Sequence, residues 1–310
     1  MSGLMCDKIK GLSIIKQEDK NKMSEELKLH GEQDNQPLFT GGFDCGYQEE
    51  PEKDKYSYKL AKMHEKYSFK EYLGVGVYSD VRKAVNNFTQ ESFAVKILKK
   101  IFIKKEKTAL RPILENLMMS EHKNITKVIE YFQDKCYYYI VYEYNPGGMV
   151  LDYIWESVNY DKRMVALVIK QILSALIYNQ SQGKEIFHKE LRPENLMIED
   201  KLLDIPSLKI NDFSTAVEFN PKDKKNKRNR KLTFSCLYFT PPEIIWKLGY
   251  NEKSDIWSVG VLLFILLTGK NPIKDISNKL TMKNIKTKDF KIEKLVEEGI
   301  IDEEAGSLLK

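Results

Sequence analysis

Two glycines separated by one residue, Gly74 and Gly76, have a spacing that could serve phosphate binding. Glycine has no Cβ, so the backbone N–H groups of such a loop can approach a phosphate closely. A third glycine is absent, and Ser79 in its place should make the tip of the loop stiffer. Because Gly-x-Gly occurs widely, the stretch taken alone is more typical of a plain β-turn.

Further stretches with chemical potential follow that loop along the chain. Lys96 ends the strand-like stretch "FAVK", and "HKELRPEN" occupies residues 188–195. The stretches "NDFS" at 211–214, "TPPE" at 240–243 and "SDIWSVG" at 254–260 come next. The order and spacing of all these stretches form a far more specific signal than the glycine loop alone.

In this order the stretches resemble the motifs of the protein kinase family, serine/threonine type, over roughly residues 67–310. The hinge-like stretch "YYYIVYEYNPGG" and the context of "HKELRPEN" are similar to calcium/calmodulin-dependent and calcium-dependent protein kinases, with degenerate catalytic motifs. The resemblance implies an α+β, two-lobed fold. A small β-rich N-lobe with one helix would cover about residues 67–144 and a mainly helical C-lobe about 147–310, with the last helices missing.

The resemblance also implies ATP and Mg²⁺ as cofactors and assigns roles to individual residues. The residues expected to cover the ATP phosphates are Gly74, Val75 and Gly76, and Lys96 would pair with the α- and β-phosphates. The residues expected around the adenine are Val81, Ala94 and Met197, together with hinge backbone groups of Glu143 and Asn145 and the bulky Tyr142 before the hinge. The expected Mg²⁺ ligands are Asn195 and Asp212, and the expected catalytic residues are Glu190, Arg192 and Lys96.

The catalytic stretch departs from the family pattern without losing charge. Glu190 stands where an Asp normally orients and deprotonates the acceptor hydroxyl, and its extra methylene moves the carboxylate by about 1 Å. Lys189 replaces an Arg and loses its bidentate fork. Arg192 replaces a Lys that contacts the γ-phosphate, yet its charge remains suitable. Ser214 replaces the glycine of the metal motif and restricts the backbone there.

A second departure concerns the ion pair that the family forms between its strand Lys and a helix Glu. Counting back from "HKNI" puts Ile113 at the Glu position, and Glu115 lies two residues further on, about 200° around a helix. An apolar stripe that contains Ile113 supports this register. Glu115 could act as the partner only after a register shift.

The elements that must position these residues can be read from the sequence period. Partial alternation rich in Val and Tyr predicts strands at 67–77, 79–87 and 91–100, and two more at 125–134 and 136–144. The helical predictions are a stripe over 110–118, a long amphipathic helix over 164–183 and a nearly all-apolar helix over 254–269. Ser254 is the expected N-cap of the last helix, and Gly269 its C-cap.

Composition and charge limit the class of protein and its partners. With 42% apolar and 31% charged residues the 310-residue chain is globular, although residues 1–66 are predicted to be a mostly disordered extension. The net charge of +5 is too small for a specific nucleic-acid binder. Four scattered cysteines predict free thiols, and the longest apolar run is too short for a membrane span, so a cytoplasmic, intracellular and soluble protein is expected.

The predicted function is ATP- and Mg²⁺-dependent transfer of a phosphoryl group to Ser/Thr hydroxyls of a protein substrate, at a slow rate. The alternative is a pseudokinase that binds nucleotide or a partner as a scaffold or regulator. The basic stretch at residues 222–231 belongs to the expected activation loop and could dock an acidic partner or remain a solvated loop. No EF-hand loop occurs, so a calcium-sensor tail is not expected within these residues.

Overall fold

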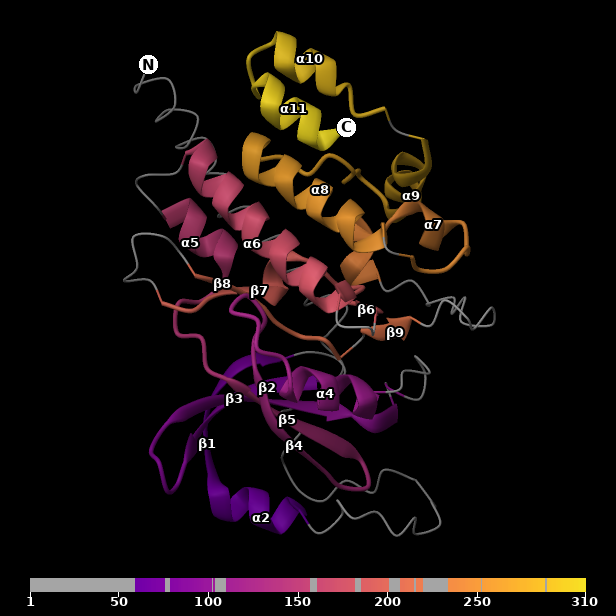
Figure 1. Cartoon of the computed structure of the whole chain (residues 1–310). Helices are drawn as coiled ribbons and strands as arrows, with labels where there is room; N and C mark the ends of the chain where they lie inside the picture. The colour runs from indigo at the N-terminus through magenta and orange to yellow at the C-terminus, as the bar shows by residue number, and fades with distance from the viewer. Residues whose placement is uncertain are drawn as a thin grey trace. The chain divides into compact units, whose positions relative to one another are not determined.

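The structure is a computed structural model of the whole chain (Figure 1). It describes residues 59–75, 79–101, 103, 110–156, 161–181, 185–200, 207–214, 216–219, 234–251, 253–287 and 289–310. The described residues divide into two compact units. The described residues of the first unit fall within Met1–Lys100 and Phe132–Val141, and those of the second within Ile101–Tyr131 and Tyr142–Lys310. The predicted α+β class with a β-rich and a mainly helical part is confirmed.

One five-stranded sheet has the order β1-β2-β3-β5-β4, and the division between the units falls within β4 and β5. Its strands are β1 Tyr67–Val75, β2 Ser79–Asn86, β3 Ser92–Lys99, β4 Val128–Gln133 and β5 Tyr137–Glu143. Each of them overlaps a strand predicted from Val- and Tyr-rich alternation. The antiparallel pairing of β1 with β2 and of β2 with β3 fixes which residues lie opposite one another.

Helix α2, Lys59–Lys66, precedes the sheet and lies within the residues predicted to form the N-terminal extension. Its Met63 is fully buried. The Asn87 side-chain amide donates to the Glu65 carbonyl at 2.7 Å, and the Asn87 backbone N–H donates to the Lys66 carbonyl at 2.8 Å. These bonds tie the end of the helix to the turn that follows β2. The remainder of the predicted extension lies outside the described residues.

The second unit is mainly helical. Its helices are α4 Leu110–Met118, α5 Val150–Glu156, α6 Lys162–Ser181, α7 Pro242–Ile245, α8 Ser254–Thr268, α9 Asn278–Thr287, α10 Ile292–Glu297 and α11 Glu303–Leu309. Its short strands form two pairs, β6 Glu185–Phe187 with β9 Val217–Phe219 and β7 Leu196–Ile198 with β8 Leu208–Ile210. The 3-10 turns are η1 Pro193–Asn195 and η2 Phe234–Phe239.

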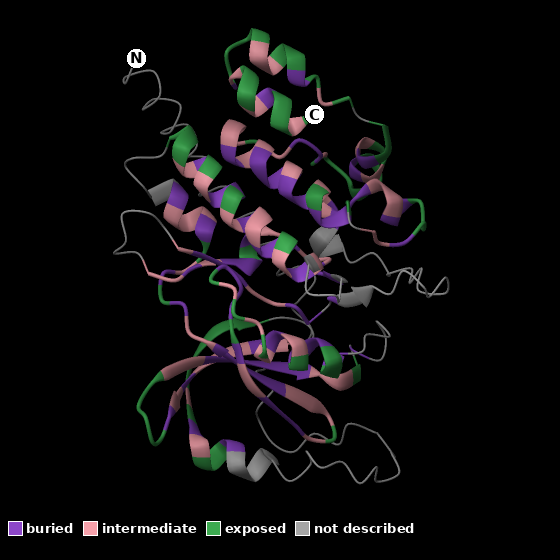
Figure 2. Ribbon diagram, viewed as in Figure 1, coloured by how far each residue is buried: buried purple, intermediate pink, exposed green. Residues whose placement is uncertain are grey.

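Helix α8 is buried along most of its length (Figure 2), as its nearly continuous apolar sequence predicts. Its C-cap is Gly269, as expected, with φ 70° and an N–H bond of 2.8 Å to the Ile265 carbonyl. The predicted N-cap is wrong, because Lys253 is the cap residue and Ser254 is already helical. The Ser254 hydroxyl instead donates to Glu243 Oε1 at 2.5 Å, so it joins α8 to α7.

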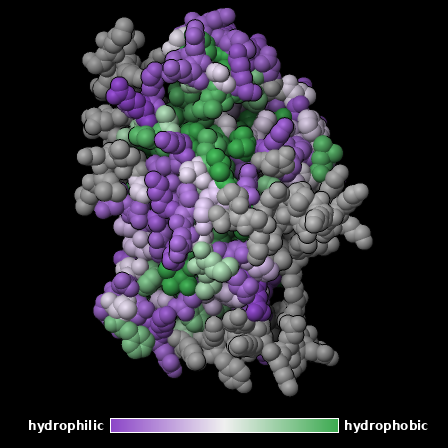
Figure 3. Space-filling model, viewed as in Figure 1, coloured by the Kyte–Doolittle hydropathy of each residue, from purple (hydrophilic) through white to green (hydrophobic). Residues whose placement is uncertain are grey.

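A groove of about 660 Å³ lies between α6, α8 and α11. Its apolar wall includes Leu173, Ile177, Leu263, Leu267 and Leu308, and Figure 3 shows apolar side chains gathered over these helices. Among the described residues no helix is both long and apolar enough to cross a membrane.

Cys136 is disulfide-bonded, so the prediction of four free thiols is wrong. Sequence spacing does not report which cysteines meet in space.

Candidate functional site

The loop after β6 is held by a buried carboxylate from α8. Asp255, only 1% exposed, accepts the backbone N–H of His188 at 2.9 Å and that of Lys189 at 3.0 Å. Bonds from N–H groups to a carboxylate are among the strong hydrogen bonds of proteins. Sequence reasoning did not name Asp255 as a site residue, although it lies in the quoted stretch "SDIWSVG". An acidic residue that opens an otherwise apolar helix was the available signal.

His188 links this loop to the "NDFS" stretch. Its ring is fully buried, and its Nδ1 accepts the Glu190 N–H at 3.3 Å. Nδ1 is therefore unprotonated, so Nε2 carries the proton and donates to the Asn211 carbonyl at 2.8 Å. The ring also packs edge-on against Phe213, with centroids 4.6 Å apart. The sequence places His188 in the "HKELRPEN" stretch but does not reveal this connecting role.

The backbone of Glu190 is fixed on both sides. Its N–H donates to His188, and its carbonyl accepts the side-chain amide of Asn195 at 2.8 Å. Lys189 just before it has φ 67°, an unusual conformation for a residue other than glycine. The Lys189 carbonyl in turn accepts the Tyr250 hydroxyl at 3.2 Å, and its ammonium lies 5.1 Å from the Tyr250 ring centroid. The Glu190 backbone is therefore held by its own hydrogen bonds and by that of the residue before it.

The two predicted metal ligands come from adjacent segments. The Asn211 N–H donates to the Asn195 carbonyl at 2.8 Å, which brings the residue before Asp212 directly against Asn195. Because the Asn195 side-chain nitrogen bonds to Glu190, its amide oxygen is the atom suited to face a cation. Asp212 has φ 63°, and its N–H donates to Asn211 Oδ1 at 2.9 Å. An amide oxygen and a carboxylate are hard donors that fit Mg²⁺.

Arg192, the predicted contact to the γ-phosphate, opens η1 in an extended conformation. Its Nε lies 3.4 Å from Glu194 Oε2, and both side chains are partly exposed. An ion pair between partly exposed side chains contributes little to stability, so the contact with Glu194 is a weak constraint on Arg192.

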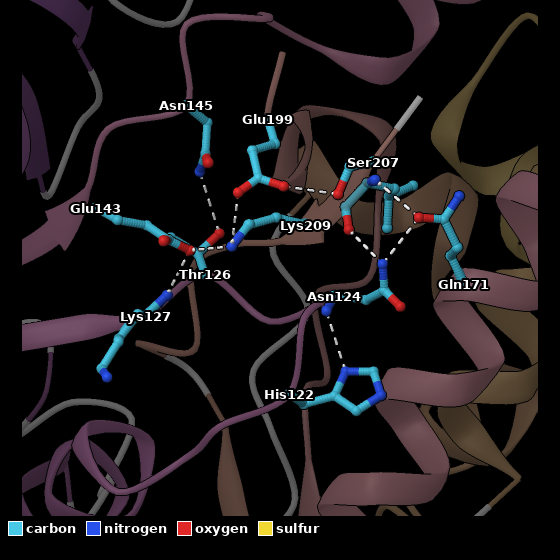
Figure 4. Close-up of polar contacts among 11 residues, drawn as sticks. His122, Asn124, Thr126, Lys127, Glu143, Asn145, Gln171, Glu199, Ser207 and Lys209 are labelled. Atoms are coloured by element: carbon cyan, nitrogen blue, oxygen red, sulfur yellow. Dashed lines mark hydrogen bonds and ion pairs between the residues drawn. The ribbon is translucent and has the colours of Figure 1, made fainter. Parts of the chain in front are cut away.

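Glu143, which is predicted to lie in the hinge, is held by a network of charges (Figure 4). The Lys209 ammonium from β8 lies 2.8 Å from Glu143 Oε1 and 3.4 Å from Glu199 Oε1. Glu143 Oε1 also accepts the Lys127 N–H at 2.9 Å, and Ser207 donates to Glu199 at 2.7 Å. Sequence reasoning missed Lys209. A lysine in the middle of the apolar stretch "LKI" was the signal that could have revealed it.

The backbone N–H of Glu143 donates to the Lys127 carbonyl at 3.1 Å. The Glu143 N–H is therefore already bonded, which leaves the carbonyl as the Glu143 backbone group to which the predicted contact with a base applies. Asn145 is buried, and its side-chain amide lies 3.4 Å from Thr126 Oγ1. Met197 lies half-buried in β7, where an isolated bridge pairs it with Met149.

Tyr142, which is predicted to precede the hinge, is buried in the second unit. Its hydroxyl has no hydrogen-bond partner among the described residues. Burial raises the pKa of Tyr142 well above its usual value, and the charge of Asp212 raises it further. The phenol therefore stays neutral at ordinary pH.

The first unit aligns several predicted nucleotide contacts on one face of its sheet. Gly74 lies opposite Val81, and Val81 lies opposite Lys96. Ala94 shares the face of Lys96 because it lies two residues away on β3. Lys96 and Ala94 are each 8% exposed. Val75 is 64% exposed at the end of β1, and the prediction for Gly76 lies outside the described residues.

Helix α4 has the register predicted from its apolar stripe. Ile113 is 2% exposed and packs with the buried Leu110, Leu114 and Leu117 on the same stripe. Glu115 points to the surface and forms an ion pair with Arg111 at 2.9 Å. No register shift brings Glu115 to the face of Ile113 within the described helix.

The basic stretch at residues 222–231, predicted to dock an acidic partner or remain a solvated loop, lies outside the described residues. Glu243 of the "TPPE" stretch lies in α7, and its Oε1 accepts the Ser254 hydroxyl from α8.

Comparison with known proteins gives a consistent result. A family model described as "Protein kinase domain" matches residues 67–309. "Calcium-dependent protein kinase 4" of Plasmodium berghei (strain Anka) is 31% identical over 226 residues, 72% of this chain and 41% of that protein. "Calcium-dependent protein kinase 5" of the same organism is 35% identical over 231 residues, 74% of this chain and 39% of that protein. The chain thus spans about two fifths of the length of these relatives.

Proposed function

Because this chain belongs to the protein kinase family, we propose that it transfers the γ-phosphoryl group of ATP to Ser/Thr hydroxyls of proteins, and that it does so slowly. The relatives named calcium-dependent protein kinases support the choice of acceptor. The observation that carries the proposal is the bond between Asn211 and Asn195, because it brings two segments with hard oxygen ligands side by side. A cytoplasmic location and an acidic partner at residues 222–231 remain predictions.

Asn195 and Asp212 are the residues that would hold Mg²⁺. When bound with ATP, the ion neutralises the charge of the phosphate oxygens. Asn195 would present its amide oxygen because its amide nitrogen holds the Glu190 carbonyl. The same hydrogen bond would couple the position of Asn195, the metal ligand, to that of Glu190, the catalytic residue. Lys96 and Arg192 would supply positive charge to the phosphates, and the Glu143 carbonyl would accept from the base.

Glu190 would orient the acceptor hydroxyl and take its proton as the phosphorus–oxygen bond forms. Its basicity is close to that of Asp, so the charge suits the task. Its reach is the difficulty. The bonds to His188 and Asn195 hold the Glu190 backbone, so in this proposal its carboxylate would stand about 1 Å beyond the position of an Asp carboxylate. A misplacement on the order of 1 Å costs about a hundredfold in rate.

The alternative, a pseudokinase that binds nucleotide or a partner, is favoured by one observation. Ile113 occupies the helix position at which the family pattern has the glutamate that pairs with the strand lysine. Glu115 is turned away and paired with Arg111. An active kinase needs the lysine to be positioned for the phosphates. Without that ion pair another contact of Lys96 has to position it.

A phosphotransfer assay with Mg²⁺-ATP separates the two functions. The variants to compare are wild type, Glu190→Asp and Lys96→Met. We expect slow transfer by wild type, about 10- to 100-fold faster transfer by Glu190→Asp, and none by Lys96→Met. The gain should appear in kcat with little change in KM for ATP, because Glu190 does not contact the nucleotide in this proposal.

A thermal-shift measurement with Mg²⁺-ATP is the companion experiment, because ligand binding raises the unfolding temperature. Wild-type transfer no greater than that of Lys96→Met, together with a clear thermal shift, would establish the pseudokinase alternative. Glu190→Asp slower than wild type would show that the pinned backbone already suits glutamate, and the argument from reach would be wrong.

A further inference from the structure

Ser214 makes a contact that the glycine of the family pattern could not make. Its side chain is only 2% exposed, and its hydroxyl donates to Asp212 Oδ1 at 2.6 Å. The Ser214 backbone N–H points to the same oxygen at 3.3 Å. The sequence alone predicts only that this serine restricts the backbone. The structure adds a short hydrogen bond to the carboxylate that would hold Mg²⁺.

Two donors on Oδ1 set the direction of the whole Asp212 carboxylate. A carboxylate has two oxygens on one rigid plane, so bonds that hold Oδ1 also fix where Oδ2 lies. The backbone of Asp212 is fixed as well. Its φ of 63° is uncommon for a residue other than glycine, and its N–H donates to Asn211 at 2.9 Å. Asn211 is itself bonded to the Asn195 carbonyl at 2.8 Å.

We propose that Ser214 is a positioning residue that orients the Asp212 carboxylate for a divalent cation. The inference rests on the proposed function, in which Asp212 and Asn195 hold Mg²⁺ beside the nucleotide. Groups that bond to a ligating carboxylate orient it, and their loss typically weakens metal binding about 10- to 100-fold. Ser214 takes this role through its hydroxyl. The hydrogen bond from the Asp212 N–H to Asn211 holds the Asp212 backbone, and Ser214 holds its side chain.

The test measures binding of a fluorescent ATP analogue as a function of free Mg²⁺, with no phosphoryl transfer. The variants are Ser214→Ala and Ser214→Gly, which lack the hydroxyl, and Ser214→Thr, which keeps it. Asp212→Asn serves as the reference for loss of the metal ligand. Each variant is also measured without Mg²⁺, because damage to the fold would lower nucleotide affinity there as well.

We expect the Mg²⁺ concentration that gives half of the maximal increase in nucleotide binding to rise about 10-fold or more in Ser214→Ala and Ser214→Gly. Nucleotide affinity without Mg²⁺ should stay at the wild-type value, and Ser214→Thr should stay close to wild type. An unchanged or lower midpoint in Ser214→Ala overturns the proposal, because the hydroxyl would then be idle or would compete with the cation. A shift in Ser214→Gly but not in Ser214→Ala overturns it too, since backbone stiffness would be the cause.

The outcomes also separate this inference from the proposed function. If wild type shows no Mg²⁺-dependent nucleotide binding, both are wrong. If wild type shows it and Asp212→Asn abolishes it, the metal assignment stands, and the Ser214 variants alone decide the inference. Should Ser214→Thr fail to fold because of its extra methyl group, the comparison of wild type with Ser214→Ala still gives the answer.

Discussion

Replacement of Lys209 by methionine should destabilise the second unit, because this lysine holds two acidic side chains together. Its side chain is 10% exposed, and its ammonium lies 2.8 Å from Glu143 Oε1 and 3.4 Å from Glu199 Oε1. Methionine preserves most of the apolar stem and removes the charge. The two carboxylates lose the cation between them, and Glu143 keeps only the Lys127 N–H as a donor among the contacts described above.

The magnitude lies between two limits. Breaking a fully buried ion pair costs about 3–5 kcal/mol, and an exposed pair contributes about 0–1 kcal/mol. The carboxylates are 28% and 46% exposed, so water can solvate them once the lysine is gone. We therefore expect the free energy of unfolding to fall by about 2 kcal/mol, in the range of a hydrogen bond to a charged group.

Urea denaturation followed by circular dichroism measures this change. Lys294→Met is a matched control, because its ammonium lies 3.5 Å from Glu298 with side chains 64% and 48% exposed. That variant should lose less than about 0.5 kcal/mol. Adding Glu143→Gln to Lys209→Met should restore part of the loss by removing an unpaired charge. Equal unfolding energies for Lys209→Met and Lys294→Met would refute the reasoning.

Two further perturbations test the packing around the hinge and the loop before it. Burial lowers the pKa of His122, and its Nδ1 accepts the Asn124 N–H at 3.1 Å, so the folded state favours the neutral ring. This stability is present above the unfolded pKa of about 6.5 and is lost as pH falls toward the lower folded pKa. Between about pH 7.5 and pH 5.5, His122→Gln should therefore lose less Tm than wild type does. Equal slopes of Tm against pH for the two proteins would contradict this. In Gly147→Ala the new Cβ would meet the Ile198 carbonyl oxygen at 2.4 Å, so urea denaturation should show a loss of about 1–3 kcal/mol. Gly260→Ala, with open space, is the control and should be neutral or slightly stabilising, and a comparable loss in both variants would show that the hinge glycine has no special role.

The types and order of the main elements could be predicted from local sequence. Alternation in "SFAVKILK" places Ala94 and Lys96 on one face of a strand, and the structure confirms the strand at Ser92–Lys99. The stripe over 110–118 established the register of α4, with Ile113 inside and Glu115 outside. These features follow from the side-chain periods of 2.0 residues in strands and 3.6 in helices, which can be read from a short stretch of sequence without knowledge of distant contacts.

Contacts between distant residues could not be predicted in this way. Asp255 holds the backbone of His188 from 67 positions away, and local periodicity says nothing about such a partner. Ser254 shows the same limit, since its type and place suited an N-cap while its hydroxyl bonds to Glu243.

The sequence by itself determined which charges the site contains and in what order they occur. Only the tertiary structure decided how firmly they are held. Glu190 illustrates the difference. Its extra methylene is evident from the residue type, but whether the backbone can absorb it depends on the bonds to His188 and Asn195. Those bonds exist because separate segments pack together and must satisfy each other's polar groups on burial.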